Sequence, residues 1–136
     1  MKEMTSQLES KNVKPSIARI KVLEYLTQYP THPTVDEIYH HLADEIPTLS
    51  KTTVYNSLKV FKEIDLVREI NLGEHQNRYD VDVSEHGHFK CDHCGRIIDL
   101  SINLQNVDAK ELEGCRIDHR HVYFRGFCSL CSASKQ

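Results

Sequence analysis

Residues 50–61 read Ser-Lys-Thr-Thr-Val-Tyr-Asn-Ser-Leu-Lys-Val-Phe. Val54, Leu58 and Phe61 recur at helical spacing, which predicts a helix that starts at Ser50 and buries one face. The opposite face carries the polar stripe Thr52, Tyr55, Asn56 and Lys59. Such a stripe is typical either of a solvated surface helix or of a helix that reaches base edges in the major groove of DNA.

The segments on either side of this helix indicate how it is used. Residues 17–28 carry apolar side chains at helical spacing, and a second helix begins at a capping box formed by Thr34 and Glu37. After the helix that starts at Ser50, residues 67–72 and 77–83 predict two short strands around a turn. Three helices followed by a hairpin outline a winged helix-turn-helix, which favours the DNA-reading interpretation of the polar stripe.

The second half of the chain has a different composition. All four prolines precede residue 48, whereas all five glycines and all five cysteines follow residue 72. This half predicts a strand around Phe89, a strand at 96–100, a helix at about 104–113 and a strand at 116–125. We therefore expect an α+β protein with a winged-helix domain at 1–82 and a small α/β domain at 83–136.

Charge and hydropathy exclude several classes of protein. The formal net charge is -3, so any DNA contact must come from a local basic patch. Residues 10–23 contain no acidic side chain, and Lys14 and Arg19 within them suit phosphate contacts. No apolar run is long enough for a membrane span or a secretory signal, which predicts a cytoplasmic protein without a membrane partner.

Four cysteines form the most specific motif. Cys91 and Cys94 make one Cys-x-x-Cys pair, and Cys128 and Cys131 make another. Two such pairs complete a closed tetrahedral zinc site, which is expected to be structural. Competing interpretations are a thiol-disulfide redox pair and buried free thiols, but a redox motif needs one pair and leaves the second unexplained.

A second metal site is suggested by residues without sulfur. His86 and His88 are two apart on an expected extended segment, so both imidazoles point to one side. Asp80 and Asp99 stand at the ends of neighbouring strands and offer carboxylates. Nitrogen and oxygen ligands suit Fe(II) or Mn(II) as well as zinc. The alternative is that these are ordinary surface residues.

Taken together, these motifs resemble the ferric uptake regulator (Fur) superfamily of bacterial metal-dependent repressors, and within it the peroxide-sensing PerR type. The resemblance rests on segments spread over nearly the whole chain: His32-Pro33-Thr34, residues 50–58, Arg78-Tyr79-Asp80, His86-Gly87-His88, Cys91-x-x-Cys94-Gly95 with Ile97-Ile98-Asp99, and Cys128-x-x-Cys131.

The resemblance implies a homodimer that binds double-stranded operator DNA, with an inverted repeat expected, and a C-terminal domain for dimerisation. It assigns a regulatory Fe(II) or Mn(II) at the hinge between the domains to five ligands: His32, Asp80, His86, His88 and Asp99. In peroxide-sensing members, bound iron reacts with hydrogen peroxide and a ligand histidine is oxidised, which by position here means His32 or His86. Ligand loss then releases DNA, so the chain is expected to be a sensor and not an enzyme.

Two alternatives remain. The first is a regulator of the same superfamily that responds to iron, zinc or manganese availability without histidine oxidation. Asp99 is the one discriminating residue, because iron-responsive members generally carry Glu there. The second is a thiol-disulfide enzyme that uses a Cys-x-x-Cys pair.

Overall fold

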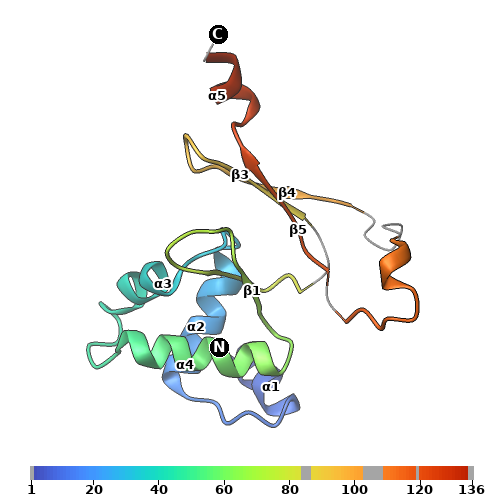
Figure 1. Ribbon diagram of the computed structural model, residues 1–136. Helices are drawn as coiled ribbons and strands as arrows, with labels where there is room; N and C mark the ends of the chain where they lie inside the picture. The colour runs from blue at the N-terminus through green and yellow to red at the C-terminus, as the bar shows by residue number, and fades with distance from the viewer. Residues whose placement is uncertain (1, 84–86, 103–108, 119, 135–136) are drawn as a thin grey trace. The chain divides into compact units, whose positions relative to one another are not determined.

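The computed structural model describes residues 2–83, 87–102, 109–118 and 120–134. Two compact units make up the chain, Met1–Val83 and Ser84–Gln136. Helices dominate the first unit, and a three-stranded sheet belongs to the second (Figure 1). The predicted α+β class is confirmed. Among the residues that the structure describes, no helix is both long and apolar enough to cross a membrane.

The N-terminal unit contains the three predicted helices and the predicted hairpin. Its elements are α1 (Lys2–Ser10), α2 (Ile17–Gln28), α3 (Val35–Leu42), α4 (Lys51–Glu63), β1 (Arg68–Ile70) and β2 (Arg78–Asp80). Strands β1 and β2 pair antiparallel, as expected of a wing. Helix α1 was not predicted from the sequence, because its nine residues offer only a narrow apolar stripe, of which Leu8 is fully buried.

Short polar side chains start the helices where the sequence predicts. The hydroxyls of Ser16, Thr34 and Ser50 each accept a hydrogen bond from the backbone amide three residues later, at 3.1, 3.2 and 3.1 Å. Each hydroxyl satisfies an amide that has no partner inside its own helix. The beginnings of α2, α3 and α4 are thus set by local chemistry.

Helix α4 is the centre of this unit, since α2 and α3 both pack against it. Val54, Leu58 and Phe61 are buried to at least 99% and belong to one apolar core. Tyr55, on the other face, is 52% exposed. The core therefore holds α4 in one rotation and leaves its polar stripe facing solvent.

The C-terminal unit is built on a sheet of order β4-β3-β5. Its strands are β3 (Gly87–Cys91), β4 (Ile97–Leu100) and β5 (Val122–Gly126). The 3-10 helix η2 (Lys110–Leu112) lies between β4 and β5 in the chain, and the short helix α5 (Ser129–Ser134) follows β5. Strand β3 runs antiparallel to β4 and parallel to β5. Because β3 and β5 are parallel, the residues that end β3 and follow β5 lie at the same end of the sheet, and both cysteine pairs come together there.

Two boundaries differ from the sequence prediction. The helix expected at 104–113 is, in its described part, only the 3-10 helix at 110–112; residues 103–108 lie outside the described residues. Leu112 is 44% exposed, and a helix this short needs packing against a core to persist. The strand expected from residue 116 begins at Val122, where pairing with Gly87 of β3 begins.

Candidate metal sites and DNA-binding face

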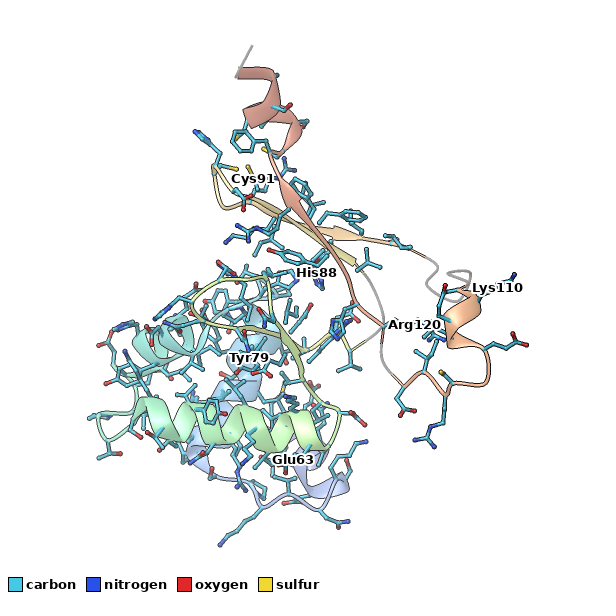
Figure 2. The ribbon with its side chains drawn as sticks, in the orientation of Figure 1. Glu63, Tyr79, His88, Cys91, Lys110 and Arg120 are labelled. Atoms are coloured by element: carbon cyan, nitrogen blue, oxygen red, sulfur yellow. The ribbon has the colours of Figure 1, made fainter. Side chains whose placement is uncertain are left out.

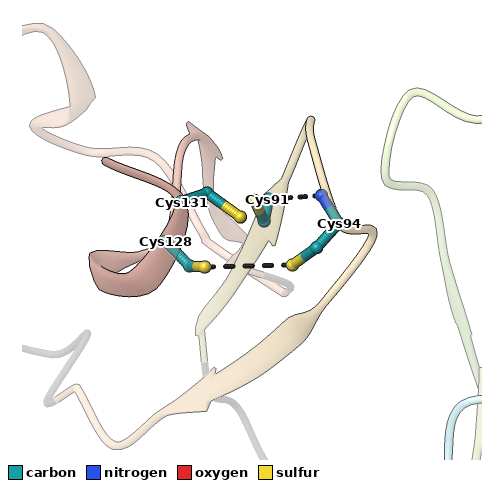
Figure 3. A group of neighbouring side chains, drawn as sticks. All are labelled: Cys91, Cys94, Cys128 and Cys131. Carbon is teal, nitrogen blue, oxygen red and sulfur yellow. Dashed lines mark hydrogen bonds between the residues drawn. The ribbon is translucent and has the colours of Figure 1, made fainter. Parts of the chain in front are cut away.

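The four cysteines come from three elements of the C-terminal unit. Cys91 ends β3, Cys94 lies in the turn that follows, Cys128 follows β5 and Cys131 belongs to α5 (Figure 3). Their sulfur atoms all lie within 4.8 Å of one another, and the Sγ atoms of Cys94 and Cys128 are 3.8 Å apart. Zn–S bonds of about 2.3 Å in a tetrahedron place the sulfurs about 3.8 Å apart, so a zinc ion fits this cluster.

The electrostatics of the cluster also favour a cation. Backbone amides, first that of Cys94 at 3.4 Å, donate to the Cys91 sulfur and lower the pKa of Cys91 to about 6. Hydrogen bonding with the Cys128 sulfur, together with burial, raises the pKa of Cys131 to about 12. Several sulfurs so close together cannot all be thiolates without a positive partner, and a zinc ion provides that partner. Gly95, at φ 78°, closes the turn that aims these amides.

The fifth cysteine, Cys115, is separate from this cluster. It lies in the exposed segment after η2 and belongs to no metal-binding group in the described part of the chain. An unpaired cysteine in a small protein is expected to be a small buried side chain, but Cys115 is exposed, because residues 115–118 run without secondary structure over the surface.

The N-terminal unit provides one pair of possible regulatory ligands. His32 precedes α3 and Asp80 ends β2, and the two are joined across 3.3 Å between Nε2 and Oδ2. Both side chains are more than 90% buried. The second carboxylate oxygen of Asp80 accepts a hydrogen bond from the amide of Asp82 at 3.0 Å, which orients the group. One imidazole nitrogen and one carboxylate oxygen are therefore held side by side.

The C-terminal unit provides a second pair. His88 of β3 and Asp99 of β4 are direct partners across the antiparallel ladder, with 3.5 Å between Nε2 and Oδ1. The His88 side chain, which is labelled in Figure 2, is buried, whereas that of Asp99 is half exposed. His86, the third ligand expected from this unit, lies outside the described residues. Each unit thus contributes nitrogen and oxygen donors without sulfur.

The predicted DNA-contacting side chains of α4 are all exposed. Thr52, Tyr55, Asn56 and Lys59 face solvent over about two turns of the helix. At the start of α2 the guanidinium of Arg19 donates to the backbone carbonyl of Lys14 at 2.8 Å. The Lys14 side chain remains exposed.

A hollow of about 470 Å³ beside Tyr55 brings in residues that the sequence reasoning missed. Gln76 and Asn77, from the turn between β1 and β2, line it together with α4 residues. The Gln76 amide donates to Asp36 at 2.8 Å, and Lys51 lies 3.1 Å from the same carboxylate. The hydrogen bond from Gln76 and the Lys51 ammonium lower the pKa of Asp36. The position of Gln76 and Asn77 in the turn after a predicted wing strand was the sequence feature that could have indicated their place beside α4.

A second set of contacts links the hairpin to α4. Tyr79 of β2 (Figure 2) donates its hydroxyl to Glu69 at 2.8 Å, and Lys62 of α4 donates to the other oxygen of Glu69 at 2.8 Å. Although burial alone raises the pKa of Glu69, the hydrogen bonds from Lys62 and Tyr79 hold it below its usual value. The wing is therefore positioned against α4 by the Lys62–Glu69 ion pair as well as by packing of Tyr79 in the core.

Comparison with known proteins agrees with this architecture. The profile of the "Ferric uptake regulator family" matches residues 10–125. The peroxide operon regulator of Bacillus subtilis is 36% identical over 135 residues, which cover 97% of this chain and 93% of that protein. The crystal structure of the Campylobacter jejuni peroxide stress regulator superposes with a TM-score of 0.66 at 30% identity, covering 96% and 97% of the two chains.

A more distant structure shares the fold. The Vibrio cholerae ferric uptake regulator superposes with a TM-score of 0.74 at 24% identity, covering 91% of this chain and 98% of that one. These relatives are named as regulators of transcription or metal uptake, and none of the three is named as an enzyme. With the zinc-compatible cysteine cluster and the winged-helix unit in place, the chain belongs to the ferric uptake regulator family.

Proposed function

We propose that this protein is a metal-dependent transcriptional repressor that senses hydrogen peroxide. The observation that carries the proposal is the pair of nitrogen and oxygen donors in each unit, His32 with Asp80 and His88 with Asp99. Such donors suit Fe(II) and Mn(II). Support also comes from the relatives named for peroxide responses.

The proposed regulatory site combines both pairs with His86. One metal ion that takes ligands from the N-terminal unit and from the C-terminal unit holds one angle between them. That angle sets whether the two α4 helices of a homodimer match the half-sites of an inverted-repeat operator. Metal binding then promotes repression, and metal loss releases the DNA.

Apolar side chains left exposed in the C-terminal unit support its role in dimerisation. Phe124 is 51% exposed and Leu130 is 72% exposed, and Leu112, Ile117 and Phe127 are each at least 36% exposed. Large apolar side chains exposed in so small a unit are available for burial against another protein. A second copy of this chain is the proposed partner.

Oxidation of a ligand is the proposed signal. Bound iron supplies the chemistry that activates peroxide: one oxygen atom of H₂O₂ is added to the imidazole of His32 or His86, and the other leaves as water. The oxidised ring no longer binds the metal ion in the same way, so the two units leave the arrangement in which the protein binds DNA. Mn(II) on the same ligands does not support this reaction.

Peptide mass spectrometry tests the sensing chemistry. Protein loaded anaerobically with Fe(II) and then given a low dose of H₂O₂ is expected to gain one oxygen on the peptides that contain His32 or His86. The Mn(II)-loaded protein is the matched control. Cleavage after glutamate separates residues 38–45, with His40 and His41, from the peptide of His32, and this peptide reports non-specific oxidation. If no histidine gains oxygen although iron is bound, the protein is instead the regulator of metal availability described above, with its fold and zinc site unchanged.

Replacement of Tyr55 by alanine tests the DNA-binding face. Because Tyr55 is exposed on the polar stripe, Tyr55→Ala is expected to weaken operator binding about ten-fold or more while metal content stays intact. Tyr29→Ala is the matched control. Tyr29 is exposed and follows the last residue of α2, whereas Arg19 lies in the first turn, so this variant should keep the wild-type affinity for the operator. Gel shifts on an operator selected from random sequences provide the measurement. Full-affinity binding by Tyr55→Ala would show that DNA contacts another face.

A thiol-disulfide enzyme is disfavoured by the cysteine geometry. In a closed zinc site all four thiolates are ligands, so neither pair is available for exchange. The close approach of all four sulfurs, within 4.8 Å, agrees with a single metal site better than with two independent redox pairs.

A further inference from the structure

His32 has an unusual backbone conformation. Its φ of 59° lies in the left-handed region, which non-glycine residues rarely adopt. The next residue is Pro33, and a residue before proline prefers an extended backbone. A residue in such a conformation persists only where its surroundings hold it there. The contacts that hold His32 are therefore part of how its imidazole is positioned.

Strand β2 provides those contacts. The Arg78 guanidinium donates from Nη1 to the His32 carbonyl at 3.1 Å. The Tyr79 amide donates to the Pro33 carbonyl at 3.0 Å, and Thr34 forms an isolated antiparallel bridge with Arg78. Residues 32–34 are thus hydrogen-bonded along β2 by an isolated bridge, beside the two-stranded sheet of the hairpin.

The same guanidinium also contacts the turn of the wing. Arg78 donates from Nε to one oxygen of Glu74 at 2.6 Å and from Nη2 to the other at 3.0 Å. Both side chains are only 18% exposed. Glu37 of α3 adds a third carboxylate contact at 3.9 Å. One planar group therefore uses its three nitrogens to join the wing turn to the backbone of His32.

We infer that Arg78 is a positioning residue that holds His32 in its ligating conformation and couples the metal site to the wing within the N-terminal unit. His32 lies at one end of this connection and Glu74 at the other. Asp80, whose carboxylate is 3.3 Å from the His32 imidazole, follows Arg78 by two residues on β2. Metal binding at these ligands then orders the wing as well as the angle between the units. This inference rests on the proposed function, because it takes His32 as a ligand.

Arg78→Lys is the informative variant. Lysine keeps the positive charge but has one nitrogen in place of the planar group of three, so it is expected to lose the link between Glu74 and the His32 carbonyl. In full-length zinc-loaded protein, we expect Mn(II) affinity to fall by about ten-fold to a hundred-fold, as when residues behind metal ligands are replaced. Free Mn(II) is measured by electron paramagnetic resonance during titration. Lys62→Met is the control, since it breaks the other ion pair of the hairpin without contacting residues 32–34.

Hydrogen exchange separates positioning from a purely structural role. In the wild-type protein, saturating Mn(II) is expected to slow amide exchange across residues 73–80. In Arg78→Lys, exchange there should stay fast even when Mn(II) saturates the site. A purely structural role would speed exchange with and without metal and preserve the slowing by Mn(II), which would overturn the inference.

The remaining outcomes are also decisive. If Arg78→Lys does not fold, Glu74→Gln is the second variant, because it keeps the arginine but weakens its two hydrogen bonds to residue 74. In Glu74→Gln, Mn(II) should likewise fail to slow amide exchange across residues 73–80. Mn(II) affinity within about two-fold of wild type in a folded Arg78→Lys protein would overturn this inference alone. Unchanged Mn(II) affinity in His32→Ala would overturn the proposed ligand set, and this inference with it.

Discussion

Replacement of Cys91 by serine is expected to remove the zinc ion and to unfold the C-terminal unit. Structural zinc contributes on the order of 10 kcal/mol or more to the folding of small zinc domains near neutral pH. Apart from the cluster members Cys91 and Cys128, His88 is the buried side chain in the described part of this unit. Without a closed site, the turn of Cys94 and the helix of Cys131 lose their common attachment.

The zinc prediction is checked on purified protein by elemental analysis and by the elution volume in gel filtration. Cys91→Ser should contain almost no zinc and should lose the dimer, because the unit proposed to form the interface is unfolded. Cys115→Ser is the matched control, since Cys115 is exposed and separate from the cluster, and it should keep one zinc ion per chain. A Cys91→Ser protein with full zinc content and wild-type hydrogen exchange in residues 87–102 would rule out the four-cysteine site.

The second large effect is expected from Phe61→Ala in α4. Phe61 is fully buried in the core where α2 and α3 meet α4, and truncation of such a ring leaves a cavity. Removal of a buried phenylalanine lowers the free energy of unfolding by about 3–5 kcal/mol. Since domains of this size have only about 5–15 kcal/mol in total, the N-terminal unit should be partly unfolded at growth temperature.

This loss of unfolding free energy is measured by thermal and urea unfolding, with the helix content followed by far-UV circular dichroism. Tyr55→Ala is the control on the same helix: its ring is 52% exposed, so its stability should change by less than about 1 kcal/mol. The two variants therefore distinguish the roles of the two faces of α4. Phe61→Ala should lose DNA binding because the unit unfolds, and Tyr55→Ala should lose it because a contact with DNA is removed. A Phe61→Ala protein as stable as wild type would mean that the core of this unit lies elsewhere.

Much of the N-terminal unit follows from local sequence. Helix α2 spans the predicted residues, and α3 and α4 begin at the predicted caps Thr34 and Ser50. Helix caps and apolar periodicity depend on a few neighbouring residues, so they can be recognised in the sequence. The same holds for the two Cys-x-x-Cys pairs, because the spacing that zinc requires within each pair is local.

Other features depend on contacts between distant segments. The sequence predicted a longer helix before Gly114 and an earlier start for β5, but a helix needs a surface to pack on and a strand needs a partner. No local pattern showed that Arg78 joins the wing turn to the carbonyl of His32, which is 46 residues away.

The sequence by itself determined the family and predicted the ligands of the proposed zinc and regulatory sites, because these depend on residue chemistry and short spacings. Only the tertiary structure decided that His32 is held in a left-handed backbone beside Asp80, and that His88 faces Asp99 across the sheet. Strand register and long-range hydrogen bonds create those pairs, and both arise only once the chain has folded.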